Sequence, residues 1–156
     1  MHVKLVPMDP PMTHAFYMGY ERDPDLCMPG EECLPYVYSK DSVHRYIEYQ
    51  LDMHRIPLAI MCDGQLVGEI ILKNISPGES ATLSITLQKP CYKDQGIGTK
   101  AEKLAVQYVF QNLDIPTCLA DTILSNTRSQ HVLEKVGFRM YKEDRDFRYY
   151  RIDREK

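Results

Sequence analysis

The chain has 156 residues, a formal net charge of −3 and 44% hydrophobic residues, which fits one globular domain with a buried core. No apolar run approaches the ~20 residues of a membrane span, and the N-terminus lacks an apolar signal core. We therefore expect a cytoplasmic protein without a membrane partner, and the acidic balance argues against nucleic acid. The five scattered cysteines include no C-x-x-C spacing, so neither a metal site nor a disulfide framework is indicated.

The N-terminal part of the chain predicts a strand, a helix and a loop. Residues 3–7 alternate as in a short strand, and Asp9 followed by Pro10 is typical of a helix start. Residues 24–38 are rich in prolines and acids and predict an irregular loop.

A second helix is predicted from about Asp41 to Arg55. Its expected N-cap is Ser39 or Asp41, since both side chains can accept a hydrogen bond from the first turn. The residues expected to be buried recur at helical spacing: Val43, Tyr46, Ile47 and Leu51.

Three strands are predicted next, at residues 58–61, 66–72 and 80–87. Asp63-Gly64 lies between the first two apolar runs and is a strong hairpin signal. In the third strand apolar and polar residues alternate, which indicates a half-buried strand.

A loop with two glycines, Gly96 and Gly98, connects this third strand to a helix that reaches Phe110. The helix is predicted from one apolar face: Ile97, Ala101, Leu104, Ala105 and Tyr108. Glycines permit a tight turn, and the free N–H groups of a helix start favour a phosphate or pyrophosphate.

This loop has more than one interpretation. Gly96, Gly98 and Ala101 also satisfy the G-x-G-x-x-A dinucleotide fingerprint, but the chain after them is too short for the further parallel strands of that fold. A Walker A loop is excluded because no Gly-Lys-Ser/Thr is present. A tight turn that binds nothing remains the plain alternative.

The C-terminal part predicts a strand at residues 118–123, then a helix with Asn126 as its cap and Gly137 at its end. Two short strands, residues 138–140 and 147–152, follow across a charged turn.

Residues 80–110 resemble motif A of the GNAT acetyltransferases, in which a strand leads through a Q/R-x-x-G-x-G/A loop into a helix. Here that loop reads KDQGIG, from Lys93 to Gly98. The run from Asn126 to Phe138 resembles the N-x-x-S-x-x-x-L-E-K-x-G-F pattern of the RimJ/RimL-like branch. The resemblance implies a single α/β (α+β) domain over residues 1–156. Its mixed, mostly antiparallel sheet of about six to seven strands would be splayed between the fourth and fifth strands and flanked by about four helices.

The resemblance further implies acetyl-CoA as co-substrate and CoA as product. Strand backbone at residues 85–87 would bind the pantetheine arm, and N–H groups from Gln95 to Thr99 the pyrophosphate. The implied cofactor-binding residues are Ile85, Thr86, Leu87, Lys93, Gln95, Gly96, Ile97, Gly98, Thr99, Asn126 and Ser129. Lys93 and Lys100 would offset the charge of Asp94.

Acetyl transfer to an amine needs a neutral nitrogen and a route by which the departing thiolate gains a proton. The two catalytic candidates are Asp121, expected in an apolar strand with a raised pKa, and Glu69, acting through water. Each is otherwise an exposed or ion-paired carboxylate. Some N-terminal acetyltransferases carry a tyrosine acid seven residues after the motif asparagine. Here that position is Leu133, so the tyrosine is absent.

In this family the region between the first two helices borders the acceptor pocket. The expected substrate-binding residues are therefore Glu31, Glu32, Tyr36 and Tyr38, although a solvated loop with packing tyrosines explains them equally well. The leading hypothesis is an N-acetyltransferase that acts in a ternary complex on a small amine or a protein N-terminus, and the resemblance allows a homodimer. The alternatives are a non-catalytic CoA-binding sensor or scaffold and an unrelated phosphate-binding module.

Overall fold

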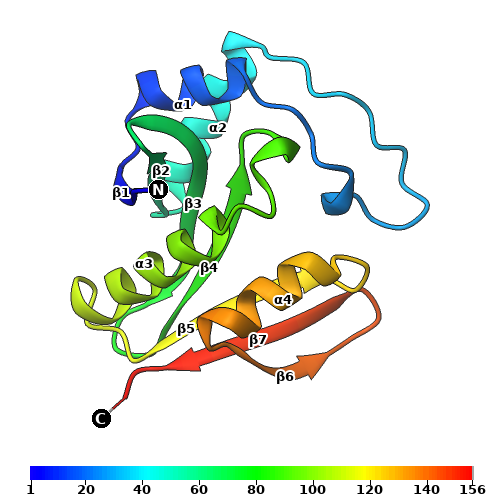
Figure 1. Ribbon diagram of the computed structural model, residues 1–156. Coiled ribbons are helices and arrows are strands. Elements are labelled where there is room, and N and C mark those ends of the chain that lie inside the picture. Colours follow the sequence, from blue (N-terminus) through cyan, green and yellow to red (C-terminus); the bar gives the residue numbers. More distant parts are fainter. Residues whose placement is uncertain (156) are drawn as a thin grey trace.

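The computed structural model describes residues 1–155, in which seven strands form one sheet flanked by four α-helices (Figure 1). The strands are β1 (Val3–Pro7), β2 (Ile56–Cys62), β3 (Gln65–Ser76), β4 (Ser80–Leu87), β5 (Thr117–Ile123), β6 (Arg139–Glu143) and β7 (Phe147–Asp153). Their order in the sheet is β1-β2-β3-β4-β5-β7-β6, and every neighbouring pair is antiparallel except β4 and β5. The predicted fold class is confirmed.

The helices are α1 (Pro10–Met18), α2 (Lys40–Asp52), α3 (Ile97–Gln111) and α4 (Thr127–Val136), with short 3-10 turns η1 (Pro24–Leu26) and η2 (Pro90–Tyr92). Leu58 and Ile60 of β2 share a core with α3, whereas Ala59 between them packs against Phe16 of α1. Successive strand residues point to opposite faces, so α1 and α3 cover opposite faces of the sheet. No helix among residues 1–155 has the length and apolar character needed to cross a membrane.

Side chains cap three of the helices as predicted. Asp9 Oδ1 accepts from the backbone N–H of Met12 at 2.9 Å at the start of α1. Ser39, rather than Asp41, caps α2. Asn126 Oδ1 accepts from the N–H of Ser129 at 3.1 Å at the start of α4. These local signals therefore set the first residue of each helix.

The predicted buried stripe of α2 is wrong at Leu51, which is 67% exposed. The helix ends at Asp52 instead of Arg55, and Gln50, two turns after Val43, is buried in place of Leu51. The side chain of Arg55 donates to Gln50 Oε1 at 3.5 Å, which supplies a partner for this buried amide.

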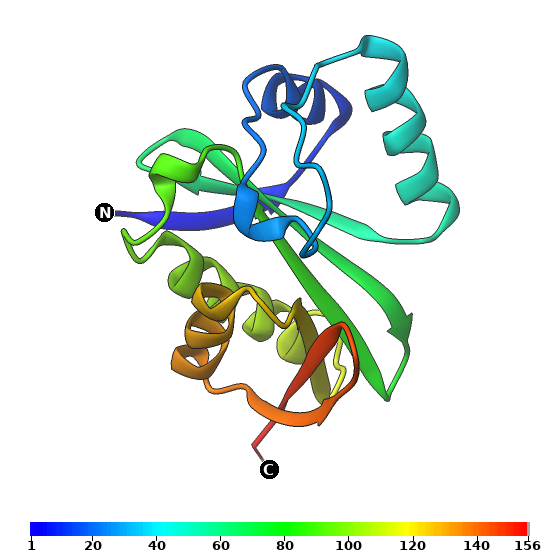
Figure 2. The same cartoon turned by 90° about the vertical axis from the view of Figure 1, so that its right-hand side faces the viewer.

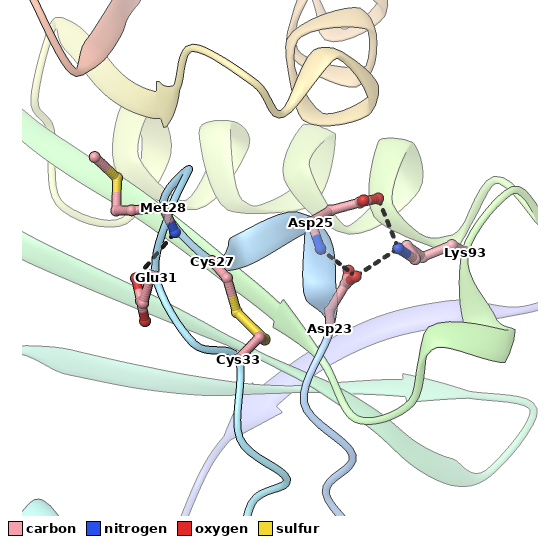
Figure 3. Close-up of a disulfide and its surroundings, with 7 residues drawn as sticks. All are labelled: Asp23, Asp25, Cys27, Met28, Glu31, Cys33 and Lys93. Carbon is pink, nitrogen blue, oxygen red and sulfur yellow. Dashed lines mark hydrogen bonds and ion pairs between the residues drawn. A yellow bond between two sulfur atoms is a disulfide. The ribbon is translucent and has the colours of Figure 1, made fainter.

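The expectation that the chain has no disulfide is also wrong, because Cys27 and Cys33 are bonded at an S–S distance of 2.01 Å (Figure 3). Gly30 has φ +82° and turns the loop between them, which brings their Cα atoms to 6.0 Å. Only the folded loop creates this proximity, so the cysteine spacing alone did not indicate it. The loop extends from α1 and α2 toward α4 (Figure 2).

Gly137 ends α4 with φ +116°, outside the range that residues with a Cβ adopt readily. An added Cβ would also lie 3.1 Å from Cδ1 of Ile152. We expect Gly137→Ala to lower the free energy of unfolding by about 1–3 kcal/mol, the usual cost of such a backbone conformation. Chemical denaturation measures this change. Gln107→Ala on the exposed side of α3 is the control, and equal stability of the two variants would contradict the prediction.

Candidate active site

The central feature of the site is a gap in the sheet between β4 and β5. These strands pair only where Ser80–Thr82 meet residues 117–119, and beyond that point they separate. On its other side β4 stays paired with β3 as far as Leu87. The β4 backbone at residues 83–87 therefore has one edge without a strand partner, which can form hydrogen bonds with an extended ligand.

Two adjoining cavities lie along this gap. We call the first the outer cavity; it is lined by Thr86, Leu87, Lys93, Gly98 and Arg128 among others. The second, the inner cavity, begins where the strands separate and is lined by Leu83 and Ser84 of β4 and residues 120–123 of β5. Both cavities share five residues: Leu26, Ile85, Glu102, Asn126 and Ser129. Together they form a continuous lining from the start of α3 into the sheet.

The glycine loop forms the start of α3 at the outer cavity. Gly96 is the N-cap residue with φ +82°, and no side chain caps the helix. The backbone N–H groups of the first turn are therefore available to an anion, and the helix dipole adds positive potential. The Gln95 side chain instead donates to the carbonyl of Cys91 at 2.7 Å, which holds the loop in place.

The cations near this helix start are paired with carboxylates of the loop after α1. Lys93 Nζ lies 2.7 Å from Oδ1 of Asp23 and 2.9 Å from Oδ2 of Asp25 (Figure 3). Arg128 Nε lies 3.5 Å from the same Asp25 oxygen. The hydrogen bond from Lys93 holds the pKa of Asp25 below its usual value. Both cations that line the outer cavity are thus ion-paired with acidic side chains of the loop.

The partner of Asp94 also differs from the one expected. The Asp94 carboxylate pairs with Arg128 of α4, whereas Lys93 bonds the loop acids and Lys100 donates to the carbonyl of Met1 at 3.4 Å. The expectation that Lys93 and Lys100 offset Asp94 is therefore wrong. The folded chain brings Arg128, from the second motif, against the loop of the first.

Glu102 of α3 is a buried carboxyl group with no partner. Its side chain is 2% exposed, and Oε2 has no hydrogen bond among residues 1–155. Burial raises its pKa to about 8, because the charged form loses its hydration there. The group is thus mostly protonated at neutral pH and faces both cavities.

Glu69 of β3 is a second buried carboxyl group, on the face that α1 and α2 cover. Its Oε1 accepts hydrogen bonds of 2.8 Å from the hydroxyls of Tyr17 and Tyr46. Burial raises the pKa of Glu69, and the two tyrosine hydrogen bonds oppose that rise only in part. Its Oε2 has no partner within the described chain. In the strand register Glu69 lies opposite Thr86 of β4, one strand from the gap.

The structure brings most of the predicted cofactor residues to one place. Ile85, Thr86, Leu87, Lys93 and Gly98 line the outer cavity. The other glycine-loop residues precede or begin α3. Asn126 and Ser129, predicted from the second motif, line both cavities, and Asn126 still serves as the helix cap.

Asp121 lines the inner cavity but is exposed to solvent. The apolar burial expected for it is therefore wrong, because its side of β5 faces outward beside Tyr149 of β7. Its carboxylate remains a candidate only by position.

The four predicted acceptor residues do not line either cavity. Glu31 Oε2 accepts from the N–H of Met28, and Glu32 is exposed. Tyr36 packs against Tyr20, with ring centroids 5.1 Å apart. The Tyr38 hydroxyl lies 2.8 Å from Nδ1 of His14. The loop residues that do reach the cavities are Asp23 and Leu26.

The sequence interpretation missed Glu102 and the two tyrosines that bind Glu69. A signal for Glu102 was present, since it lies between Gly98 and Val106 at four-residue spacing on the inner side of α3. No local pattern indicates Tyr17 and Tyr46, because their common partner is on a distant strand. No group of three or more potential metal ligands occurs within residues 1–155.

The family model for an "Acetyltransferase (GNAT) domain" matches residues 3–139. This match spans most of the 156 residues, and the chain therefore belongs to the GNAT acetyltransferase family. The strand, glycine loop and helix of the predicted motif lie inside the matched range. Among curated proteins, none matches the sequence significantly.

Solved structures share this fold at low sequence identity. N-acetyltransferase PseH of Campylobacter jejuni superposes with a TM-score of 0.73 at 16% identity, covering 98% of this chain and 99% of that one. Spermidine N-acetyltransferase of Vibrio cholerae, in complex with CoA and spermine, gives 0.78 at 18%, covering 97% and 95%. Aminoglycoside acetyltransferase AAC(6')-Ib, in complex with coenzyme A, gives 0.80 at 17%, covering 98% and 95%.

Glu102 makes the stability of the protein depend on pH. The folded state holds its proton up to a pKa of about 8, above the ordinary glutamate value of 4.5 in the unfolded chain, so the stabilisation is complete below about pH 4.5 and is lost as the pH rises through 8. Glu102→Gln is neutral at every pH. We therefore expect the free energy of unfolding of this variant, relative to wild type, to rise by several kcal/mol between pH 4.5 and 8, since a tenfold change in proton affinity is worth about 1.4 kcal/mol.

Urea denaturation at a series of pH values measures this difference. Glu134→Gln on the exposed side of α4 is the matched control, and its difference from wild type should not vary with pH. A constant difference for Glu102→Gln would mean that Glu102 is charged in the folded protein at neutral pH.

Proposed function

We propose that this protein is an acetyl-CoA-dependent N-acetyltransferase that transfers the acetyl group directly to a primary amine in a ternary complex. The observation that carries the proposal is the gap between β4 and β5, whose unpaired β4 edge leads to the uncapped start of α3. An extended pantetheine arm needs such an edge, and a pyrophosphate needs such a helix start. PseH of Campylobacter jejuni has been solved with acetyl coenzyme A and has the same fold.

The residues present fit this co-substrate. The β4 backbone at residues 85–87 would hydrogen-bond the pantetheine arm, and one of its N–H groups would polarise the thioester carbonyl. The N–H groups of residues 95–99 would hold the pyrophosphate, with Lys93 as a nearby cation. Asn126 and Ser129 would contact the arm from the α4 side of the gap. When bound, acetyl-CoA supplies the activated acetyl group and a thiol leaving group.

We assign the general base to Glu69. Tyr17 and Tyr46 hold Oε1 in place, and the free Oε2 can accept a proton through a water molecule or directly from an ammonium group. A buried carboxyl group whose pKa is raised is better matched to this task than an exposed one. Asp121 at the inner cavity is the alternative base and is ranked second because it is exposed.

The acceptor side favours a cationic amine. Four tyrosines of α1, α2 and the intervening loop pack around one another: Tyr17, Tyr20, Tyr36 and Tyr46. The hydroxyls of Tyr17 and Tyr46 donate hydrogen bonds to Glu69. Aromatic faces and a buried carboxylate both attract an ammonium group. Small amines such as a polyamine or an aminoglycoside therefore come first, and protein N-termini follow from the likeness of residues 126–138 to the RimJ/RimL-like branch. A CoA-binding protein without catalytic activity is the alternative.

The direct test is thiol release from acetyl-CoA with the purified protein and a panel of amines. The panel contains spermidine, amino acids, an aminoglycoside and short peptides with free Ala or Ser N-termini. Thermal stabilisation by acetyl-CoA is measured in parallel. Turnover with one class supports the proposal and selects the acceptor. Stabilisation without turnover would favour the non-catalytic alternative. The absence of both stabilisation and turnover would contradict acetyl-CoA binding at the gap.

Replacing the proposed base should separate catalysis from binding. We expect Glu69→Gln to lower kcat about 100-fold or more, the usual contribution of a general base. Stabilisation by acetyl-CoA should remain, because Glu69 lies on the opposite face of the sheet from α3. Glu79→Gln in the exposed turn before β4 is the control. A larger loss for Asp121→Asn than for Glu69→Gln would reverse the ranking of the two carboxylates.

The loop acids should weaken binding of the phosphates. Asp25 pairs with both Lys93 and Arg128, so Asp25→Asn removes one of the two carboxylates that pair with each cation. Asp23 stays paired with Lys93, and Asp94 stays paired with Arg128. Exposed pairs contribute about 0.2–1 kcal/mol, which predicts an acetyl-CoA Kd up to about fivefold lower. Titration calorimetry at low salt measures it, with Asp52→Asn at the exposed end of α2 as control. A higher Kd for Asp25→Asn than for wild type would show that Asp25 promotes acetyl-CoA binding instead.

A further inference from the structure

The proposed reaction has a base but no assigned acid for the departing sulfur. Position 133, where some N-acetyltransferases carry a tyrosine acid, is the apolar Leu133, and its side chain lines the inner cavity. Glu102 lines the same cavity from α3. One buried acidic group therefore lines the same cavity as the apolar residue at position 133.

The inner cavity lies where the thioester sulfur of a bound acetyl-CoA is expected. Pairing of β4 with β5 stops at Thr82 and Leu119, and the inner cavity is lined by the residues that follow directly on both strands. The outer cavity lies at the start of α3, where a pyrophosphate binds. A pantetheine arm that runs inward from α3 along β4 therefore brings its sulfur toward the inner cavity.

We propose that Glu102 is the general acid of this enzyme and donates its proton to the sulfur of CoA as the thioester breaks. The inference rests on the proposed acetyltransferase function and adds a catalytic residue to it. Two observations carry it. Glu102 lines both cavities at their junction, and its Oε2 has no hydrogen-bond partner in the described chain although the side chain is almost fully buried. An unsatisfied buried polar atom is costly unless a ligand uses it.

The step balances in atoms and charge. The lone pair of the neutral amine forms the new N–C bond at the thioester carbonyl, and the C–S bond breaks with its electron pair going to sulfur. The carboxyl proton of Glu102 passes to that sulfur and yields the thiol of CoA. The proton lost by the nitrogen passes to Glu69, directly or through water, and solvent later restores the proton of Glu102.

The groups around Glu102 allow it to hold this proton. Cys118 of β5 is a titratable neighbour of Glu102, and burial together with Glu102 raises the pKa of this cysteine to about 12, so the thiol is neutral. Asp121 on β5 faces the inner cavity, while Asp23, Lys93 and Arg128 face the outer one. Lys93 and Arg128, the two cations that line the outer cavity, are paired with Asp23, Asp25 and Asp94 rather than with Glu102. Its pKa of about 8 follows from burial alone.

The experiment compares Glu102→Gln with wild type on the best acceptor of the amine panel between pH 6 and 10, a range of about two units on either side of the pKa of about 8. Titration of the amine cancels in the ratio of the two kcat values. We expect wild type to be about 100-fold faster below pH 7, the usual contribution of a general acid. The ratio should fall as the pH rises past 8, because wild type then loses its proton while glutamine never had one.

Three further measurements make the test decisive. Acetyl-CoA should stabilise Glu102→Gln against heat as well as it stabilises wild type, since the amide fills the same space. Glu102→Met, which introduces an apolar side chain of similar length, should show the same loss of kcat. This variant replaces Glu102→Gln in the test if Glu102→Gln does not fold. Glu134→Gln on α4 should behave as wild type.

The outcomes that overturn the proposal are distinct. A kcat ratio that stays constant across the pH range, or one within threefold of unity, means that Glu102 is not the acid, while turnover by wild type still supports the acetyltransferase. Loss of acetyl-CoA stabilisation in both Glu102 variants assigns the residue to binding instead. Absence of turnover by wild type with every amine overturns the acetyltransferase function and this proposal together.

Discussion

Backbone hydrogen bonding between β4 and β5 is satisfied for only three residues on each strand, and the rest of the site depends on where it stops. In an ordinary sheet the two strands would stay paired, because buried N–H and C=O groups without partners are costly. Here β3 holds β4 on one side and β7 holds β5 on the other, so both strands stay extended while the space between them opens. The sheet itself therefore supplies a preformed edge for a ligand, and α3 begins where that edge ends.

Two buried carboxyl groups lie on opposite faces of the sheet. Glu102 lines the gap, whereas Glu69 lies on β3, one strand away from it. Glu69 Oε1 accepts two tyrosine hydrogen bonds, whereas Glu102 Oε2 has no hydrogen-bond partner among residues 1–155. Burial raises the pKa of both. Carboxyl groups held in environments that shift their proton affinity are typical of acid–base pairs. In the proposed reaction Glu69 would receive the proton of the amine, and Glu102 would protonate the departing thiol.

The loop between α1 and α2 supplies acidic side chains that pair with the cations of the outer cavity. Asp23 and Asp25 both pair with Lys93, and the Cys27–Cys33 bond closes the turn that follows them (Figure 3). Asp25 also pairs with Arg128. Leu26 between these features lines both cavities. A phosphate-bearing ligand must therefore compete with the loop acids for the same cations, so the affinity of the site depends on the loop as well as on the glycine turn.

Local sequence determined the helices and strands of this protein and the position of its glycine loop. Caps such as Asp9, the Asp63-Gly64 hairpin and Gly96 act through neighbouring backbone, so their effects can be predicted from spacing. The disulfide, the contact of Arg128 with Asp94 and the partners of Glu69 join residues that lie in different elements or across a folded loop. Only the tertiary structure decided those, and it also decided burial, which left Asp121 exposed and enclosed Glu102. Burial is the physical quantity that shifts a carboxyl pKa, and a strand or helix pattern alone does not specify it.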